Sequence, residues 1–303
     1  MRVGIIGAGS VGTGMGILLG QRGYVIAGVA SRTLASAQKA AARIKCPVYT
    51  APEEVARRSD LVLITTNDQA IGPVAEVVAG RGGFRPGQTV MHMSGSLTSD
   101  VLNPAREAGA WAVSLHPLQS CADADRAVAN LPGSVFSIEG DREAYPLAEK
   151  IVRDLEGEFF YITAEAKPLY HAAACVASNY LVTLVDLSRQ LMAAAGVPAE
   201  LAARALEPLS AGTWKNIAAR GVPEALTGPI SRGDLSTITD HLKAMRRKAP
   251  ELIPLYTALG RYTVGLARRK GSIDEHKAAA FLKLMAPARA TVETGSLRRA
   301  GEA

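Results

Sequence analysis

The first 33 residues constrain the fold of this chain more than any other stretch. Arg2 to Ile6 is short, apolar and β-branched, as in a buried strand, and Tyr24 to Ala30 has the same character. Between them, GAGSVG opens a helical segment, and glycines at these spacings permit a tight turn, close approach of a pyrophosphate and close helix packing. The start of the helix also offers unpaired N–H groups to phosphate. We therefore predict a dinucleotide site in which the pyrophosphate contacts Gly7, Gly9, Ser10, Val11 and Gly12.

The residues after the second strand indicate which dinucleotide binds. An NAD site usually has Asp or Glu there, which accepts a hydrogen bond from the ribose 2′-hydroxyl. This chain instead has Ser31, Arg32 and Thr33, and no acid occurs before Glu53. A guanidinium with two hydroxyls suits a 2′-phosphate, whereas a carboxylate would repel it. The alternative is that Arg32 is only a solvated loop residue, but its position favours NADP(H) as the cofactor.

Composition excludes several classes of protein. The chain has 303 residues, 48% of them hydrophobic, which is enough for two domains with cores. No apolar stretch is long enough for a membrane helix, and the glycine-patterned start does not read as a signal peptide. Cys46, Cys121 and Cys175 form no CxxC pair, which fits a reducing compartment. We expect a cytoplasmic protein.

The net charge of +6 suits a small anionic substrate as well as an anionic cofactor. Nucleic acid is the alternative partner for a basic chain. However, the basic residues are dispersed, and aromatic residues are only 5% of the chain without an interleaved pattern. We therefore expect neither a nucleic-acid nor a membrane partner.

Alternating strand and helix patterns in the first half predict an α/β Rossmann domain, with a doubly wound, mostly parallel sheet, over residues 1–164. Residues 165–303 show no strand pattern and predict an all-α helical domain. Lys167 to Ala195 reads as one long helix, which we expect to be the spine of that domain and a homodimer contact. The tail from Pro287 onward is expected to be loosely ordered.

Polar residues follow several predicted strands, at the sheet edge where ligands of α/β proteins bind. Thr65, Thr66 and Asn67 are predicted to line the cofactor groove, and Ser94 and Gly95 to contact the nicotinamide amide. His116, before Pro117, is a candidate proton donor, because a neutral imidazole can hold or donate a proton near pH 7. Simple turn chemistry for the serines and loop anchoring for the histidine are the structural alternatives.

Three polar residues of the predicted long helix share one face, since His171, Cys175 and Asn179 are spaced i, i+4, i+8. Burying such a stripe is costly unless its groups find partners, which favours a site role for His171 and Asn179. Cys175 fits a small core residue. A metal site formed with His116 is disfavoured, because no acid or second cysteine stands at ligand spacing, and we predict no metal.

A run framed by glycine and proline, TGPISRGD, is the densest group of turn residues in the second half. Arg232 is a candidate clamp for a substrate carboxylate. Asp234 suits a helix N-cap as well as a substrate contact, and His241 lies on the same helix face. We name as further candidate substrate contacts Ser96, Gln119, Asp234 and His241.

Six blocks, in order, resemble a bacterial family of Rossmann-like oxidoreductases whose helical C-terminal domain is of unknown function: GIIGAGSVGTGM, DLVLITTNDQAI, MHMSGSLTSDVL, SLHPLQS, LYHAAACVASNYLVTL and LTGPISRGDLSTITDHL. The resemblance implies an NADP-dependent oxidoreductase, with ketopantoate reduction as one activity. More distant similarity to ketopantoate reductases maps a catalytic Lys and two Asn onto His171, Cys175 and Asn179. His116-Pro117 resembles the catalytic His-Pro of prephenate dehydrogenases, and pyrroline-carboxylate reductases share the Rossmann half.

These observations predict an NADPH-dependent reductase of a small carbonyl acid, a 2-oxo or β-oxo acid of the ketopantoate kind. It would be an oxidoreductase of CH–OH/C=O groups, with hydride transfer in a cleft between the domains. His116 or His171 would donate the proton, Asn179 would orient the substrate and Arg232 would pair with its carboxylate. The alternatives are an NADP(H)-binding redox sensor without turnover and a prephenate-type dehydrogenase, because a Rossmann fold alone does not imply catalysis.

Overall fold

The computed structural model describes residues 1–287. The chain divides into two compact units, Met1–Tyr180 and a second that begins at Leu181. The sheet ends at Tyr161, and the described chain after it is helical, from Ala164 to Leu284, so the division between units falls one helix later than the change in secondary structure. The domain boundary after Ala164 stays a prediction. Nearly all of the tail that we expect to be loosely ordered lies outside the described residues.

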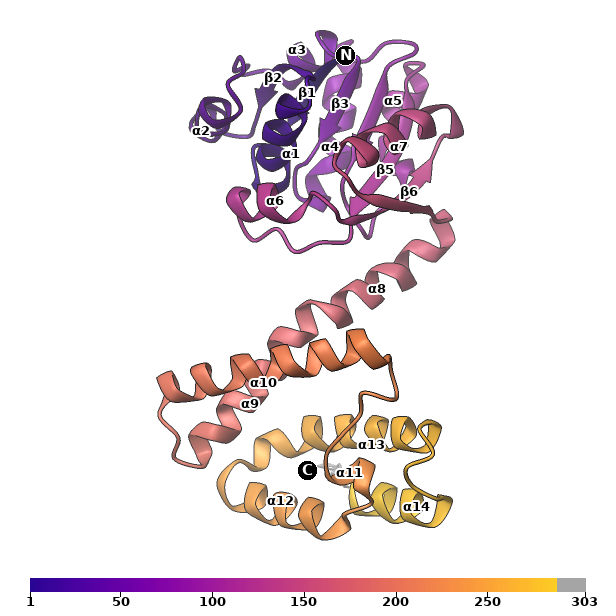
Figure 1. Cartoon of the computed structure of the whole chain (residues 1–303). Helices are drawn as coiled ribbons and strands as arrows, with labels where there is room; N and C mark the ends of the chain where they lie inside the picture. Colours follow the sequence, from indigo (N-terminus) through magenta and orange to yellow (C-terminus); the bar gives the residue numbers. More distant parts are fainter. Residues whose placement is uncertain (288–303) are drawn as a thin grey trace, which may run out of the picture. The chain divides into compact units, whose positions relative to one another are not determined.

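The first unit is built on a seven-stranded sheet with the order β2-β1-β3-β4-β5-β6-β7 (Figure 1). All neighbouring pairs are parallel except β5 and β6, which are antiparallel. This confirms the predicted doubly wound, mostly parallel sheet. The strands are β1 (Arg2–Ile6), β2 (Val25–Ala30), β3 (Leu61–Ile64), β4 (Thr89–His92), β5 (Trp111–Pro117), β6 (Val135–Gly140) and β7 (Glu158–Tyr161).

Helices cover both faces of this sheet, which is why its central strands are continuously apolar. On β3, Leu61 and Leu63 face one core while Val62 and Ile64 face the other. The first core is closed by α1 (Ser10–Gln21), α6 (Ala124–Asn130) and α7 (Tyr145–Asp154), and the second by α3 (Pro52–Arg57), α4 (Asp68–Gly80), η1 (Ser99–Leu102) and α5 (Asn103–Glu107). Helix α2 (Leu34–Ile44) packs beside β2, and the one-turn η2 (Arg142–Ala144) precedes α7.

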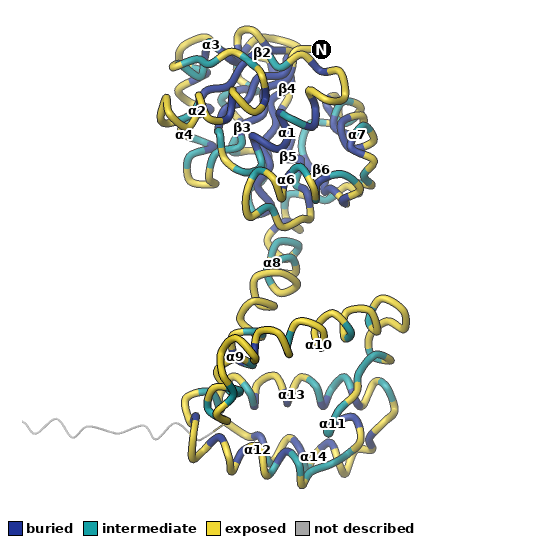
Figure 2. The backbone as a smooth tube through the Cα atoms, turned by 60° about the vertical axis from the view of Figure 1, so that its left-hand side comes forward, coloured by how far each residue is buried: buried dark blue, intermediate teal, exposed yellow. Residues whose placement is uncertain are grey.

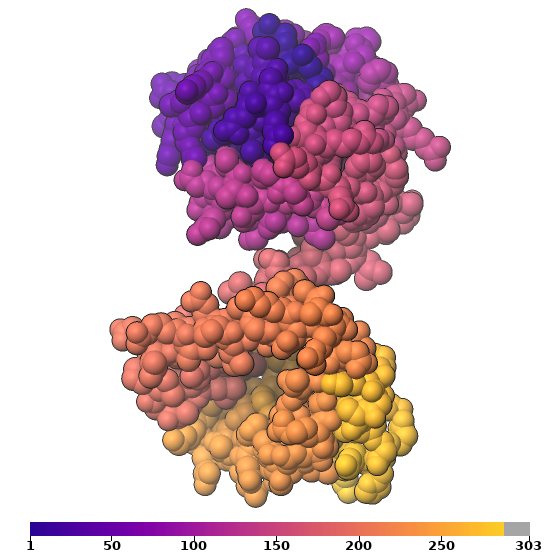
Figure 3. Space-filling model, viewed as in Figure 1, coloured from indigo at the N-terminus to yellow at the C-terminus, as the bar shows by residue number. Residues whose placement is uncertain are grey.

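Strand order places a topological switch beside β1, because β2 lies on one side of it and β3 on the other. Ligands of open α/β sheets bind at such a point, beyond the carboxyl ends of the strands. Helix α6, which the sequence analysis does not predict, packs against α1, and the two segments adjoin on the face seen in Figure 3. Asp123 caps α6 by accepting a hydrogen bond from the Arg126 N–H at 2.8 Å.

The predicted long helix is in fact two helices. After the short turn η3 (Ala164–Ala166), α8 (Lys167–Ala177) ends at Ser178, whose N–H donates to the Ala174 carbonyl, and α9 (Asn179–Ala194) begins directly after it. An apolar, alanine-rich pattern continues through this point, and no helix stop signal marks the break.

The described part of the second unit is helical, as predicted. Its core lies among α11 (Pro229–Arg232), α12 (Leu235–Lys248), η4 (Pro250–Leu252), α13 (Ile253–Arg269) and α14 (Glu275–Leu284). Helices α9 and α10 (Ala199–Arg220) contribute little to that core and are mostly exposed (Figure 2). No helix of the described residues is both long and apolar enough to cross a membrane.

Candidate functional site

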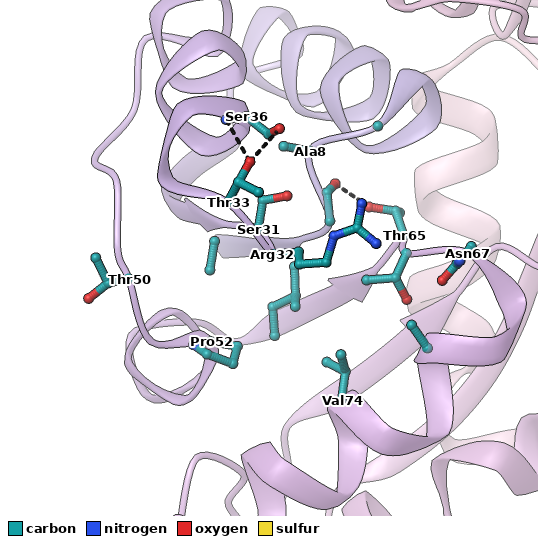
Figure 4. Close-up of a pocket in the computed structure, with 16 residues that line it drawn as sticks. Ala8, Ser31, Arg32, Thr33, Ser36, Thr50, Pro52, Thr65, Asn67 and Val74 are labelled. Carbon is teal, nitrogen blue, oxygen red and sulfur yellow. Dashed lines mark hydrogen bonds between the residues drawn. The ribbon is translucent and has the colours of Figure 1, made fainter.

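A cavity of about 640 Å³ opens at the carboxyl ends of β1, β2 and β3 (Figure 4). Its walls come from the glycine turn after β1, the loop after β2 and the segment that joins β3 to α4. Eight of the predicted cofactor residues line it: Gly7, Gly9, Ser31, Arg32, Thr33, Thr65, Thr66 and Asn67. The structure therefore brings the three predicted groups together around one space.

The three glycines of the turn are needed for different reasons. Gly7 has a φ of +118°, and a Cβ there would lie 2.6 Å from the carbonyl carbon of Thr65. A Cβ on Gly12 would lie 2.1 Å from the carbonyl oxygen of Gly7, so Gly12 lets α1 begin against the turn. At Gly9 a Cβ would meet no atom within 4 Å, so this position of the backbone faces open space at the cavity.

The loop after β2 supplies the polar end of the cavity. Thr33 caps α2, accepting from the Ser36 N–H at 3.3 Å and donating to the Ser36 Oγ at 2.8 Å. Arg32 is exposed and forms no ion pair with any acid of the described residues. Among the described residues that line the cavity, it is the single cation and none is an acid.

These features fit a dinucleotide with a 2′-phosphate. The wall offers a glycine turn open at Gly9, hydroxyls near one guanidinium, and no carboxylate to repel a phosphate. The Thr66 hydroxyl is buried without a hydrogen-bond partner in the described part of the chain, which leaves a polar atom for a ligand to satisfy. Sequence reasoning missed Ser36 and Thr50 in the lining, although Ser36 could have been found as the residue three positions after the cap.

Five predicted cofactor residues do not line this cavity. Ser10 donates to the Ala122 carbonyl at 3.3 Å, and Val11 and Gly12 lie with it in the first turn of α1. Ser94 and Gly95 belong instead to a second group of polar residues, at the ends of β4 and β5.

His116 is the centre of that second group. Its Nδ1 lies 2.7 Å from the hydroxyl of Tyr170, and its ring centroid lies 6.3 Å from that of His171. Gly95 lies against both imidazoles, since a Cβ there would lie 2.7 Å from His116 Nε2 and 2.8 Å from His171 Nδ1. The structure thus brings together the two predicted proton donors. They lie against Gly95, where any larger residue would displace an imidazole.

The protonation state of His116 follows from its surroundings. Burial, and then the positive charge of Lys167, lower the pKa of His116 to about 4, so the imidazole is neutral at pH 7. Burial raises the pKa of Tyr170, whose hydroxyl therefore keeps its hydrogen. His92, fully buried on β4, has its pKa lowered to about 4 mainly by burial.

The loop that carries Gly95 is tied to the cavity wall. Asp68, the first residue of α4, accepts hydrogen bonds from Ser94 Oγ at 2.8 Å and Ser96 Oγ at 2.7 Å. Since Asp68 directly follows the lining residue Asn67, one carboxylate connects the cofactor cavity to the loop under His116. Sequence reasoning did not single out Asp68, which came into view only with its partners.

Lys167 is another residue that sequence reasoning missed. It has no exposed surface, and its Nζ donates to Ser114 Oγ at 2.7 Å and lies 3.5 Å from the Ser94 carbonyl oxygen. Burial lowers its pKa, while Glu139 and Asp68 oppose the shift. A fully buried lysine is rare unless it is paired, so its place beside the loop needs an explanation.

The remaining predicted residues lie elsewhere and keep the status of predictions. Asn179 is exposed at the start of α9, while Gln119 bonds the Asn130 carbonyl and the Ser134 hydroxyl, each at 3.2 Å. In the helical unit, Arg232 is exposed, Asp234 caps α12 and His241 Nδ1 lies 2.7 Å from the hydroxyl of Tyr256.

Cys175 Sγ lies 3.6 Å from His171 Nε2. Over residues 1–287, no group of three His, Cys, Asp or Glu side chains is arranged to hold a metal ion.

Comparison with known proteins agrees with this architecture. The model of a Rossmann-like domain matches residues 1–117, and that of a domain of unknown function, DUF2520, matches residues 134–263. The search of the curated proteins finds no match.

Solved structures share the fold across nearly the whole chain. Protein BF3122 of Bacteroides fragilis, named a "putative NADP oxidoreductase", is 23% identical, with a TM-score of 0.69 over 86% of this chain and 96% of its own. Protein TM1727 of Thermotoga maritima is 25% identical, with a TM-score of 0.68 over 89% and 99%. A reductive aminase of Aspergillus terreus, solved with NADPH and ethyl-5-oxohexanoate, is 18% identical, with a TM-score of 0.62 over 93% and 99%. The two family models thus match successive parts of the chain, residues 1–117 and residues 134–263.

Proposed function

We propose that the protein is an NADPH-dependent reductase of a small carbonyl acid. The observation that carries the proposal is the cavity at the ends of β1, β2 and β3. It combines a glycine turn open at Gly9 with Arg32 and contains no acid among its described residues. The fold shared with BF3122 and with the NADPH-bound reductive aminase supports the same cofactor.

The cofactor would be held by residues already placed around the cavity. Gly7 and Gly9 would lie along the pyrophosphate, and Ser31, Arg32 and Thr33 would bind the 2′-phosphate. Bound there, NADPH supplies a hydride. The remaining task of the protein is to orient the substrate and to stabilise the charge that develops on its oxygen.

His116 suits that task. A neutral imidazole can donate a hydrogen bond from one ring nitrogen while the other is held by a fixed partner, here the Tyr170 hydroxyl. A substrate carbonyl near Nε2 would then gain negative charge against a hydrogen-bond donor. The net charge of +6 favours a substrate with a carboxylate.

The test is NADPH oxidation followed by absorbance, with a panel of 2-oxo acids, β-oxo acids and imines. We expect turnover with at least one oxo acid, and a loss of about 100-fold or more in kcat for His116→Ala with little change in NADPH affinity. Full turnover in both His116→Ala and His171→Ala would refute the assignment of the donor. Tight NADPH binding without consumption would support the alternative of a redox sensor without turnover. Reduction of NADP⁺ in the presence of prephenate would support the alternative of a prephenate-type dehydrogenase.

We propose further that the helical unit forms a homodimer. On α9 and α10, large apolar side chains lie in solvent, including Val182 at 71% exposure, Leu209 at 65% and Trp214 at 65%. Patches of this kind mark interaction surfaces. Light scattering of the wild type should give twice the mass of one chain. Trp214→Glu should lower the measured mass towards that of one chain. A monomeric wild-type protein would contradict the proposal.

A further inference from the structure

The first turn of α8 reaches the loop under His116 with two residues that neither the glycine turn nor the histidine pair accounts for. Lys167 and Tyr170, spaced i, i+3, lie on one face of the helix. Both side chains end within the group formed by the ends of β4 and β5.

The contact with Tyr170 bears on which nitrogen of His116 carries the hydrogen. A neutral imidazole has one N–H, and Nδ1 is the hydrogen-bond partner of the Tyr170 hydroxyl at 2.7 Å. A protonated phenol can donate its hydrogen to Nδ1, and in that arrangement Nδ1 accepts. The imidazole hydrogen is then on Nε2, the atom that lies beside Gly95.

Lys167 acts on the same imidazole through the loop and through its charge. Its Nζ bridges Ser114 and the Ser94 carbonyl, which fixes the peptide leading into Gly95. No carboxylate of the described residues forms a salt bridge with it, although Glu139 and Asp68 are near enough to favour its charged form. The other titratable groups that face His116 are His171 on the same helix, Asp68 on α4 and His92 on β4.

We propose that Lys167 and Tyr170 are positioning residues for His116. Lys167 fixes the loop beneath the imidazole and places a positive charge near it, and the Tyr170 hydroxyl selects the Nε2–H tautomer, so that Nε2 is the hydrogen-bond donor to the substrate oxygen. This inference rests on the proposed reductase function. Neither residue is assigned a contact with substrate. Lys167 is fully buried with its Nζ directed at Ser114, and the Tyr170 hydroxyl is engaged by Nδ1.

The test reads the imidazole directly and needs no substrate. The chain has five histidines, so ¹⁵N-histidine labelling gives few signals, and His116→Gln assigns the one in question. The variants are Tyr170→Phe and Lys167→Met, each close in size to the residue it replaces. Tyr180→Phe and Lys215→Met, at exposed positions, are the matched controls.

In the wild type we expect a single Nε2–H tautomer and a titration midpoint below pH 5. Tyr170→Phe should give a mixture of both tautomers. Lys167→Met should raise the midpoint by about half to one pH unit, because an opposing positive charge is removed while burial, the larger cause of the lowered pKa, remains. The controls should behave as the wild type does.

A single Nε2–H tautomer in Tyr170→Phe overturns the role of Tyr170, and an unchanged midpoint in Lys167→Met overturns that of Lys167. If circular dichroism shows that Lys167→Met is unfolded, Lys167→Gln replaces it. That variant also removes the positive charge but keeps a polar group for the Ser114 hydroxyl, and the same criterion applies, a shift of the His116 midpoint.

Kinetics separates this inference from the proposed function. With an accepted oxo acid, both variants should lower kcat by about 10- to 100-fold at unchanged KM for NADPH. In a plot of kcat against pH, Lys167→Met should also move the acid limb to higher pH, in step with the titration midpoint of His116. If the NMR changes occur but the wild type reduces nothing in the panel, the reductase proposal fails while the control of His116 stands. If the wild type reduces an oxo acid but the NMR changes do not occur, the reductase proposal stands and the control of His116 by Lys167 and Tyr170 fails.

Discussion

Removing the guanidinium of Arg32 is the sharpest single test of how the cavity selects its ligand. The side chain is exposed at the cavity rim, and among the described lining residues it is the only cation. In Arg32→Ala the hydroxyls of Ser31 and Thr33 remain. The change therefore removes one charge from the polar end of the cavity and leaves the glycine turn intact.

The expected loss of NADPH affinity follows from the hydrogen bond that the guanidinium would donate to the 2′-phosphate. A hydrogen bond to a charged group contributes about 1.5–3 kcal/mol net, and each 1.4 kcal/mol is a factor of ten in affinity. Arg32→Ala should therefore weaken NADPH binding by about 10- to 150-fold. NADH lacks the 2′-phosphate, so its affinity should change little.

Both cofactors can be titrated by fluorescence and by the shift in melting temperature that a ligand of the folded state produces. Lys39→Ala is the matched control, because Lys39 is exposed on the adjacent helix α2, outside the cavity lining, and carries the same charge. Equal losses for NADPH and NADH, or equal effects of the two substitutions, would refute the role of Arg32.

Three further predictions concern individual positions. Gly12→Ala places a Cβ 2.1 Å from the Gly7 carbonyl oxygen and should destabilise the fold by about 1–3 kcal/mol in chemical denaturation, whereas Gly9→Ala, in open space, should retain stability and lose NADPH affinity. Gly95→Ala should keep NADPH binding and lose most turnover, because its Cβ would displace the imidazoles; wild-type kcat would contradict this. Hydrogen bonds from the first turn of α12 lower the pKa of Asp234 to about 2, so its contribution to stability is present above about pH 4 and is lost as pH falls towards 2. Asp234→Ala should accordingly lower Tm at pH 7, and the difference from wild type should narrow across that range.

Much of the predicted cofactor site could be identified from short local sequence patterns. The glycine turn could be read directly, since its requirements are set by backbone geometry within a few residues. The segment after β2 was equally accessible, because a residue at the end of a known strand has a known neighbourhood. Hence eight predicted cofactor residues line one cavity.

Roles that depend on contacts between residues far apart in the chain could not be predicted from local sequence. Asp68 has no feature in the sequence that separates it from any acid at a helix start. Its significance comes from serines 26 and 28 residues away. Helix α6 and the break at Ser178 were missed for the related reason that short helices and small changes of direction leave no periodic pattern.

The sequence by itself determined the layered α/β fold, the helical second half and the likeness of the first turn to an NADP site, because each depends on hydrophobic period and on residues close together in the chain. Only the tertiary structure decided which polar groups share a site. Parallel strands bring their carboxyl ends to one edge regardless of separation in sequence, so His116 lies between Gly95 and Tyr170. The same packing buries Lys167 beside Ser114, and in a buried site a charge interacts more strongly with its neighbours than it would in water.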